Sequence, residues 1–308
     1  MRVSLIFHFS LFTFHFFKRF TMKTFKFTAI IMALSLLISC QQKTTAGDCP
    51  KTEKKIALQM YSVRDDIGKD FKGTIAALAA LGFKDMEAAS YGNGKFYGLT
   101  PEEFKAEMDA VGLNSLSSHT GRSLADEVAK TDWTNIWEWW DTCIAAHKTA
   151  GMKYIVTPSM PTPKTLADLK VYCDYYNQIG EKCNQQGIRF GYHNHDFEFQ
   201  TIEGEIMYDF MLKNTDPEKV FFQMDVYWTV VARKSPVEYF KTYPGRFELL
   251  HIKDHKELGE SGMVGFDAIY RNVETAGTIY SIIEVEEYNY SPLESVKKSL
   301  DYLETAPF

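Results

Sequence analysis

Several polar residues follow short apolar segments, each at the point where the segment ends. His193 and His195 follow residues 188–192, Asp225 follows 220–224, His251 follows 247–250, and Glu284 follows 280–283. Imidazole and carboxylate groups that successive strands bring together can hold a divalent cation with an open coordination position. Two nitrogen and two oxygen donors suit Mn²⁺, Co²⁺, Zn²⁺ or Fe²⁺ better than Ca²⁺, which prefers an all-oxygen shell. The sequence therefore predicts a metal site.

From residue 54 onward, short segments rich in β-forming residues alternate with longer segments of helical periodicity. This alternation predicts a parallel sheet whose strands are joined by helical crossovers. The first predicted strand is followed by Gln-Met-Tyr-Ser-Val-Arg, not by the glycine-rich turn of an open doubly wound sheet. We therefore expect an α/β fold, a single-domain TIM (β/α)8 barrel over residues 54–308. The expected strands are 55–60, 83–88, 114–119, 154–158, 188–194, 220–226, 247–253 and 280–286; the expected helices are 69–81, 101–112, 132–150, 164–187, 205–214, 235–243, 265–276 and 292–304.

In such a barrel, the polar residues at the carboxyl ends of the strands point into one shared mouth. Side chains alternate along a strand, so His193 and His195 share a face, as do His251 and Lys253, and Glu284 and Glu286. A single histidine or carboxylate at a strand end is more often structural. Four successive strand ends with metal-type donors favour a cation, because burying that charge without one would be costly.

The N-terminal region reads as a secretory signal. Lys23 and Lys26 precede an apolar run over residues 27–38, which is shorter than the ~20 residues that span a bilayer. The residues before Cys40 resemble a bacterial lipoprotein box, which implies that Cys40 is lipidated; a retained membrane helix is the alternative. We expect residues 1–39 to be the signal region, with 1–21 translated from upstream of the true start. Residues 40–53 would tether an exported, membrane-anchored lipoprotein that faces the periplasm or the cell surface.

Charge and cysteine content limit the partners. The net charge is −6 for the whole chain and −11 for residues 40–308, because residues 1–39 hold five Lys or Arg and no acid. An acidic surface repels phosphate backbones and argues against nucleic acid. Cys49, Cys143, Cys173 and Cys183 form no CxxC pair and are expected to be buried thiols. The sequence leaves the oligomeric state open.

The chain resembles the xylose isomerase-like TIM barrels, often called sugar phosphate isomerases and epimerases. The resemblance covers about residues 54–304 and rests on the order and spacing of several motifs. These are Ile-Ala-Leu-Gln-Met-Tyr-Ser-Val-Arg-Asp at 56–65, Gly-Phe-Lys-Asp-Met-Glu at 82–87, Ser-Ser-His at 117–119, Tyr-His-Asn-His at 192–195, Met-Asp at 224–225, His-Ile-Lys-Asp at 251–254 and Ile-Ile-Glu-Val-Glu at 282–286.

The resemblance implies a divalent metal held by Glu, Asp, His and Glu from four consecutive strands. The last three correspond to Asp225, His251 and Glu284. The first differs, because His193 stands where the family usually has Glu before Asn-His. We assign His193 as the replacement ligand, with His195 as the alternative ligand or as a substrate contact.

The remaining side chains of the mouth are candidates for contacts with the substrate, and two of them have an alternative role. Gln59, Glu87 and His119 match polar positions that could contact sugar hydroxyls. Lys253 could stabilise an enolate oxygen or form an ion pair with Glu286, itself a candidate substrate contact. Trp228 could stack on a sugar face or pack under the following loop. The expected catalytic residues are Glu284, His195 and Lys253.

The resemblance implies a metal-dependent enzyme that removes a proton α to a sugar carbonyl. Replacement of one carboxylate by imidazole breaks the two-base symmetry of the family's isomerases and epimerases. A 3-keto-glycoside lyase that uses the same metal site for β-elimination is therefore one alternative, and a non-catalytic sugar-binding lipoprotein is another. Mn²⁺, Co²⁺ or Zn²⁺ is the expected cofactor. Export favours an unphosphorylated sugar or keto-glycoside, and export and acidity disfavour the endonuclease branch of the family.

Overall fold

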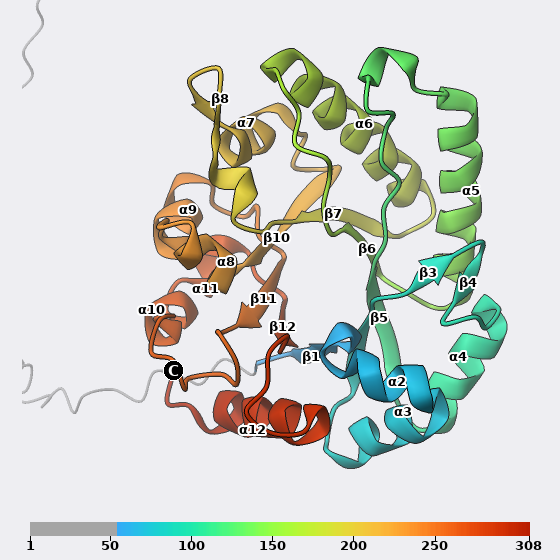
Figure 1. The fold of residues 1–308 in the computed structure, drawn as a ribbon, viewed down its shortest axis with the longest axis vertical. Helices are drawn as coiled ribbons and strands as arrows, with labels where there is room; N and C mark the ends of the chain where they lie inside the picture. The colour runs from blue at the N-terminus through green and yellow to red at the C-terminus, as the bar shows by residue number, and fades with distance from the viewer. Residues whose placement is uncertain (1–53) are drawn as a thin grey trace, which may run out of the picture. The chain divides into compact units, whose positions relative to one another are not determined.

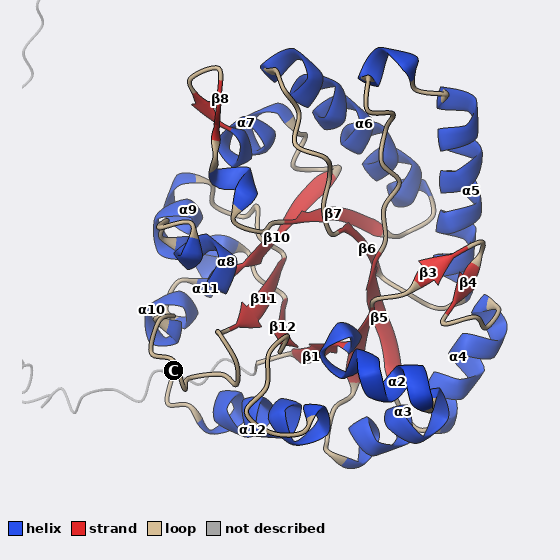
Figure 2. Ribbon diagram, in the orientation of Figure 1, coloured by secondary structure: helices blue, strands red, loops and turns tan. Residues whose placement is uncertain are grey.

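The computed structural model describes residues 54–308, and within them eight parallel strands close into a barrel (Figure 1). Around the barrel the strands follow the order β1, β12, β11, β10, β7, β6, β5 and β2. Helices surround the ring of strands on its outside (Figure 2). The predicted TIM barrel is confirmed. The strands are β1 (Ile56–Gln59), β2 (Asp85–Ala88), β5 (Asn114–His119), β6 (Tyr154–Thr157), β7 (Arg189–His193), β10 (Val220–Asp225), β11 (Leu249–Lys253) and β12 (Tyr280–Glu284).

The helices of the outer ring begin where the sequence carries capping residues. Thr100 and Glu103 form a capping box at the start of α4, and Ser235 caps α9 ahead of Pro236. Gly187, which follows α6, has a φ of 76 and so adopts the left-handed conformation. Glycine adopts this conformation readily because it has no Cβ. The predicted helices correspond to α3 (Phe71–Ala80), α4 (Pro101–Ala110), α5 (Trp133–Thr149), α6 (Leu166–Gln185), α7 (Met207–Asn214), α9 (Pro236–Thr242), α10 (Phe266–Tyr270) with α11 (Val273–Ala276), and α12 (Pro292–Thr305).

Several short elements were not predicted. The expected helix 265–276 is divided into α10 and α11. Short helices follow two strands at the mouth of the barrel, where periodicity over so few residues gives little signal. Two small antiparallel hairpins also lie outside the barrel sheet. These elements are η1 (Met60–Val63), α2 (Arg64–Lys69), η2 (Val128–Lys130), η3 (Phe197–Phe199), α8 (Val226–Val231), the hairpin β3 (Tyr91–Gly92) with β4 (Lys95–Phe96), and the hairpin β8 (Thr201–Ile202) with β9 (Glu205–Ile206).

The barrel interior changes from apolar to polar along the strands. A buried apolar cluster includes Phe221 of β10, Leu249 of β11 and Ile282 of β12. Two residues further along each of these strands stand Gln223, His251 and Glu284, which alternation places on the same interior face. A packed apolar base therefore supports a polar layer at the carboxyl ends.

The described part of the chain contains no helix that is long and apolar enough to cross a membrane. Cys143, Cys173 and Cys183 are free and buried, as predicted. The signal region, Cys40 and the tether lie outside the described residues, so the N-terminal assignments remain predictions.

Candidate metal centre

The barrel brings together donors from neighbouring strands at its polar end. One ligand atom from each of Asp225, His251 and Glu284 lies within 4.8 Å of the others. A second group with the same spacing contains His119, His193 and His251. The three residues that match the family's metal ligands thus converge, and His251 belongs to both groups. His193 belongs to the second group, with His119 and His251.

His251 lies between two carboxylates. Its Nε2 is 2.6 Å from Oε1 of Glu87, and its Nδ1 is 3.2 Å from Oε2 of Glu284. Burial alone would lower the pKa of His251, but Glu284 and Glu87 raise it to about 10. Burial would raise the pKa of Glu284, and the charge of His251 nevertheless lowers it. Glu87 thus holds Nε2, whereas Nδ1 faces the carboxylates that would share a cation.

Asp225 is buried with one oxygen unpaired. Its Oδ1 accepts a hydrogen bond from the backbone N–H of Trp228 at 2.9 Å, whereas Oδ2 has no hydrogen-bond partner. Burial raises the pKa of Asp225 to about 7, despite the opposing charge of Lys253. Buried polar atoms without partners are rare in folded proteins, because each costs free energy. Oδ2 of Asp225 is therefore a suitable cation ligand.

Glu87 accepts hydrogen bonds from several neighbouring side chains. Gln59 donates its amide N–H to Oε1 at 2.8 Å, and Ser117 donates its hydroxyl to Oε2 at 2.6 Å. Oε1 also lies 3.1 Å from Nε2 of His119. Burial would raise the pKa of Glu87, but His119 and His251 hold it well below its usual value. Glu87 is thus an ionised carboxylate enclosed by donors.

Gln59 and Glu87, which we expect to contact substrate, form hydrogen bonds within the protein. Both side chains are fully buried, and Oε1 of Gln59 accepts the backbone N–H of Tyr61 at 3.0 Å. Glu87 contacts His119 and His251 directly, and Gln59 contacts them through Glu87. Their contacts with a substrate remain predictions.

His119 and His193 share an acceptor that the sequence analysis missed. Oε1 of Gln223 lies 2.7 Å from Nε2 of His119 and 3.1 Å from Nδ1 of His193. Burial, followed by the charges of His251 and His119, lowers the pKa of His193 well below its usual value. His193 is therefore a neutral imidazole, the form that binds metals. Gln223 precedes Asp225 by two residues, and strand alternation was the signal that could have found it.

The other predicted residues lie around this centre. The ring of His195 is 5.0 Å from that of His193 and 5.8 Å from that of Trp228. Nδ1 of His195 is buried without a partner, and burial lowers its pKa. Lys253 forms an ion pair with Glu286 at 2.9 Å and lies over the Trp228 ring at 5.8 Å. The ion pair expected as one reading of Lys253 is present.

Asn194 is a second residue that the sequence analysis left without a role. Its Oδ1 accepts the backbone N–H of Asp225 at 3.2 Å, and its Nδ2 lies 3.4 Å from the hydroxyl of Thr229. These contacts join the end of β7 to the end of β10. Asn194 therefore fixes the backbone that carries Asp225.

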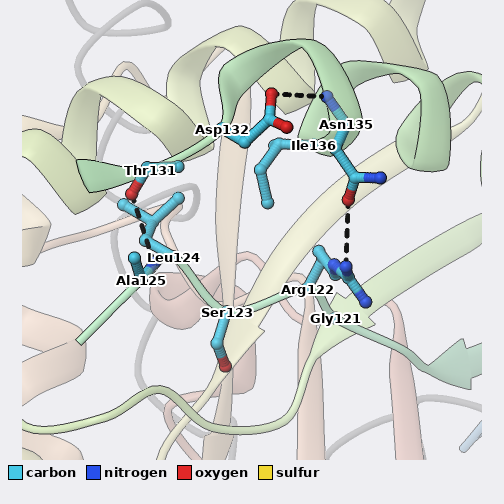
Figure 3. Close-up of a pocket in the computed structure, with 9 residues that line it drawn as sticks. All are labelled: Gly121, Arg122, Ser123, Leu124, Ala125, Thr131, Asp132, Asn135 and Ile136. Carbon is cyan, nitrogen blue, oxygen red and sulfur yellow. Dashed lines mark hydrogen bonds between the residues drawn. The ribbon is translucent and has the colours of Figure 1, made fainter. Parts of the chain in front are cut away.

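A cavity of about 460 Å³ follows β5 (Figure 3). Its lining comes from one stretch of chain, residues 121–136, which begins two residues after His119. Arg122 donates to Oδ1 of Asn135 at 3.0 Å, and the backbone N–H of Ala125 donates to the hydroxyl of Thr131 at 3.2 Å. The cavity is distinct from the cluster of histidines and carboxylates, and it offers polar groups to a small ligand.

The fold and the site together define a TIM barrel with a cluster of possible metal ligands at the carboxyl ends of its strands. The family model for the xylose isomerase-like TIM barrel matches residues 75–306. The chain therefore belongs to the xylose isomerase-like TIM barrel family.

Solved structures with substantial sequence identity agree with the family. Two structures of a sugar phosphate isomerase/epimerase from Parabacteroides distasonis are 35% and 34% identical to this chain. The first covers 82% of this chain and 99% of its own, with a TM-score of 0.75. The second covers 85% and 98%, with a TM-score of 0.78.

More distant relatives carry enzyme names. An inosose dehydratase from Lacticaseibacillus casei is 24% identical over 153 residues, which is 41% of this chain. The match spans about half (51%) of that relative. A 3-keto-D-glucoside 4-epimerase from E. coli is 16% identical, with a TM-score of 0.62 and coverage of 82% of this chain and 100% of its own. IOLI, a protein solved with a zinc atom, is 13% identical, with a TM-score of 0.61 and coverage of 81% and 96%. At these identities the two structures share the fold alone.

Proposed function

We propose that this chain is a divalent-metal-dependent sugar isomerase or epimerase that removes a proton α to the carbonyl of an unphosphorylated sugar. The observation that carries the proposal is the convergence of Asp225, His251 and Glu284, with ligand atoms within 4.8 Å of one another. The family membership supports a sugar as the substrate class, because its relatives are named as sugar isomerases and epimerases.

The donor set suits a cation such as Zn²⁺, Co²⁺ or Mn²⁺. Oδ2 of Asp225, Nδ1 of His251, a carboxylate oxygen of Glu284 and Nε2 of His193 would hold it, and His251 would release its Nδ1 proton on binding. The unpaired Oδ2 of Asp225 supports this fit, and so does the neutral state of His193. When bound, the metal would supply a Lewis acid that polarises a carbonyl.

Glu284 is the base best placed for proton removal. Its carboxylate is ionised, and it accepts the proton from the carbon next to the carbonyl while the C–H electron pair becomes the double bond of an enolate. Lys253 is held in its charged form by Asp225, Glu284 and Glu286. Its ammonium group would stabilise the negative charge on the enolate oxygen. Return of a proton to the other face would complete an epimerisation.

A second outcome, β-elimination from a 3-keto-glycoside, is favoured by the make-up of the centre. The position that the family fills with a second base carries the imidazole of His193. Elimination needs one base and one acid, not two opposed carboxylates. The enolate would expel the β-alkoxy group, which would take its proton from His195 once that imidazole is protonated. The names of the dehydratase and keto-glucoside relatives agree with chemistry next to a carbonyl.

The proposal is tested by metal content and by product analysis. Purified protein should retain Zn²⁺, Co²⁺ or Mn²⁺, and Asp225→Asn and His251→Ala should lose both the metal and activity while retaining the fold. Incubation with 3-keto-glucosides separates the outcomes, because elimination releases the aglycone and epimerisation does not. Unchanged metal content in both variants would remove the site. A metal-binding wild type that binds sugars without turning them over would instead indicate a sugar-binding lipoprotein.

We also propose that the protein is exported and anchored through a lipid on Cys40. The basic, apolar and small-residue order of residues 22–40 supports this placement. Sugar phosphates are made and kept in the cytoplasm, so an unphosphorylated substrate fits an exported enzyme. The oligomeric state does not enter the proposal.

A further inference from the structure

Gln223 occupies a buried position between the carboxylate of Glu87 and two histidines. Its Nε2 donates to Oε2 of Glu87 at 2.9 Å. An ionised carboxylate can only accept hydrogen bonds, so the amide nitrogen of Gln223 must be the group that faces it. The amide oxygen therefore points the other way, toward His119 and His193.

This orientation determines which histidine nitrogens carry protons. Oε1 of Gln223 accepts from Nε2 of His119 at 2.7 Å and from Nδ1 of His193 at 3.1 Å. A neutral imidazole has one N–H and one lone pair. With its N–H on Nδ1, His193 is consequently left with its lone pair on Nε2, whereas His119 carries an N–H on Nε2.

The histidine rings lie close together, so the nitrogen that carries each proton affects the neighbouring rings. The ring centroids of His119 and His193 are 4.8 Å apart, and those of His193 and His251 are 4.5 Å apart. With the opposite tautomer, Nδ1 of His193 would have no proton 3.1 Å from the amide oxygen, and Nε2 would carry an N–H in place of the lone pair that could bind a metal. One misplaced proton would then both remove a ligand and break a hydrogen bond.

We propose that Gln223 is a positioning residue of the metal centre, which holds an N–H on Nε2 of His119 and on Nδ1 of His193 and so presents Nε2 of His193 as a ligand. Glu87 in turn orients the ring of His251, whose Nε2 it holds at 2.6 Å. Partners behind metal-binding histidines commonly fix ring orientation and tautomer. The consequence for metal binding rests on the proposed function, whereas the tautomers themselves do not.

The first experiment measures tautomers in the metal-free protein. Long-range ¹H–¹⁵N correlation spectra of ¹⁵N-histidine protein should show His193 protonated at Nδ1 and His119 at Nε2. In Gln223→Met, which has a side chain of similar length without hydrogen-bonding groups, His193 should become a mixture of tautomers. Wild-type His193 protonated at Nε2 would overturn the inference, whether or not the variant folds.

Ser117→Ala is the matched control. Ser117 donates to Oε2 of Glu87, the same oxygen that Gln223 contacts, but no hydrogen bond joins it to a histidine. Both variants therefore remove one donor from one carboxylate oxygen, and only Gln223→Met removes the acceptor of the two imidazoles. Ser117→Ala should keep the wild-type tautomers. Equal changes in both variants would show that Gln223 acts only through Glu87, which would overturn the inference.

The second experiment measures metal affinity by competition with a chromogenic chelator, using Zn²⁺ and Co²⁺. Gln223→Met should weaken binding by about 10- to 100-fold, whereas Ser117→Ala should change it far less. Undiminished affinity in a variant that has lost the tautomer would refute the link to metal binding. If the wild type binds neither metal, the proposed function fails, and the spectra of metal-free protein still decide the role of Gln223.

Discussion

At the scale of single residues, two buried histidines in one centre are held in opposite protonation states. Burial lowers the pKa of each, but only His251 lies between carboxylates, and these raise its pKa to about 10. His193 contacts an amide oxygen and other imidazoles, so its pKa remains low and it is neutral. Neighbouring groups, not burial itself, decide which imidazole carries the charge.

Lys253 provides a prediction at this scale. Its side chain is buried and charged beside Asp225, Glu284 and Glu286. Lys253→Met should lower kcat/KM by at least about 10²-fold by removing an electrostatic contact to the enolate, with metal content unchanged. Glu286→Gln breaks the ion pair at 2.9 Å but keeps the ammonium group, so its loss should be smaller. Kinetics and metal analysis of both variants measure this, and equal losses would make the ion pair the only role of Lys253.

At the scale of secondary structure, the strands were the most predictable elements. All eight were predicted within two residues at either end, because buried parallel strands appear as short apolar runs. Glu284 and His251 were located for the same reason, since both follow such runs. The short helices α2 and α8 gave too few residues for a periodic signal. The contacts of Glu87 and Gln223 join strands that are far apart in sequence, so no local pattern could reveal them.

Gly191 of β7 gives a prediction about the packing beneath the site. A Cβ at this position would lie 2.5 Å from the ring of Phe221, closer than real contacts allow. Gly191→Ala should therefore lower the free energy of unfolding by about 1–3 kcal/mol, through displacement of a fully buried ring. Chemical denaturation measures the change. Gly68→Ala adds a methyl group where no atom lies within 4 Å and serves as the control; equal losses would contradict the packing argument.

His147 of α5 gives a prediction about pH. Its Nδ1 donates to the carbonyl of Cys143 at 2.7 Å, its Nε2 lies 2.6 Å from the hydroxyl of Ser118, and burial lowers its pKa to about 4. The unfolded state thus binds the proton first as pH falls below 6.5. The stability from neutral His147 is complete above pH 6.5 and is lost as pH falls toward 4, by about 3 kcal/mol in total.

Urea denaturation between pH 4 and pH 7 tests this linkage. His147→Gln cannot titrate in that range, so its stability should fall less steeply with acid than that of the wild type. Ser118→Ala removes a hydrogen-bond partner but keeps the titrating ring, and it should retain the steeper fall. If the free energy of unfolding fell equally steeply with acid in His147→Gln and in the wild type, the proton bound by His147 would not contribute to the pH dependence.

At the scale of the whole molecule, the described residues 54–308 form a barrel that contains the complete predicted set of metal donors. The N-terminal segment contributes none of these donors in the proposal. Its predicted task is delivery to a membrane surface.

Lipidation can therefore be separated from chemistry. In a bacterial host, the full-length protein should incorporate labelled fatty acid and sediment with membranes, and Cys40→Ala should do neither. A soluble Cys40→Ala protein should still bind the metal, because the donors lie between residues 119 and 284. Membrane association of Cys40→Ala, with no labelling of either the variant or the wild type, would indicate the retained helix instead of a lipid anchor.

The three metal donors and the cavity after β5 lie on different elements of the barrel, and this separation has a consequence. Asp225, His251 and Glu284 belong to strands of the barrel, whereas the cavity after β5 is lined by the connection that follows this strand and by the first turn of α5. Grafting another loop in place of residues 121–131 would change the lining of the cavity and leave the strands that carry the three donors in place. The lining of this cavity can therefore vary while the predicted metal ligands are kept.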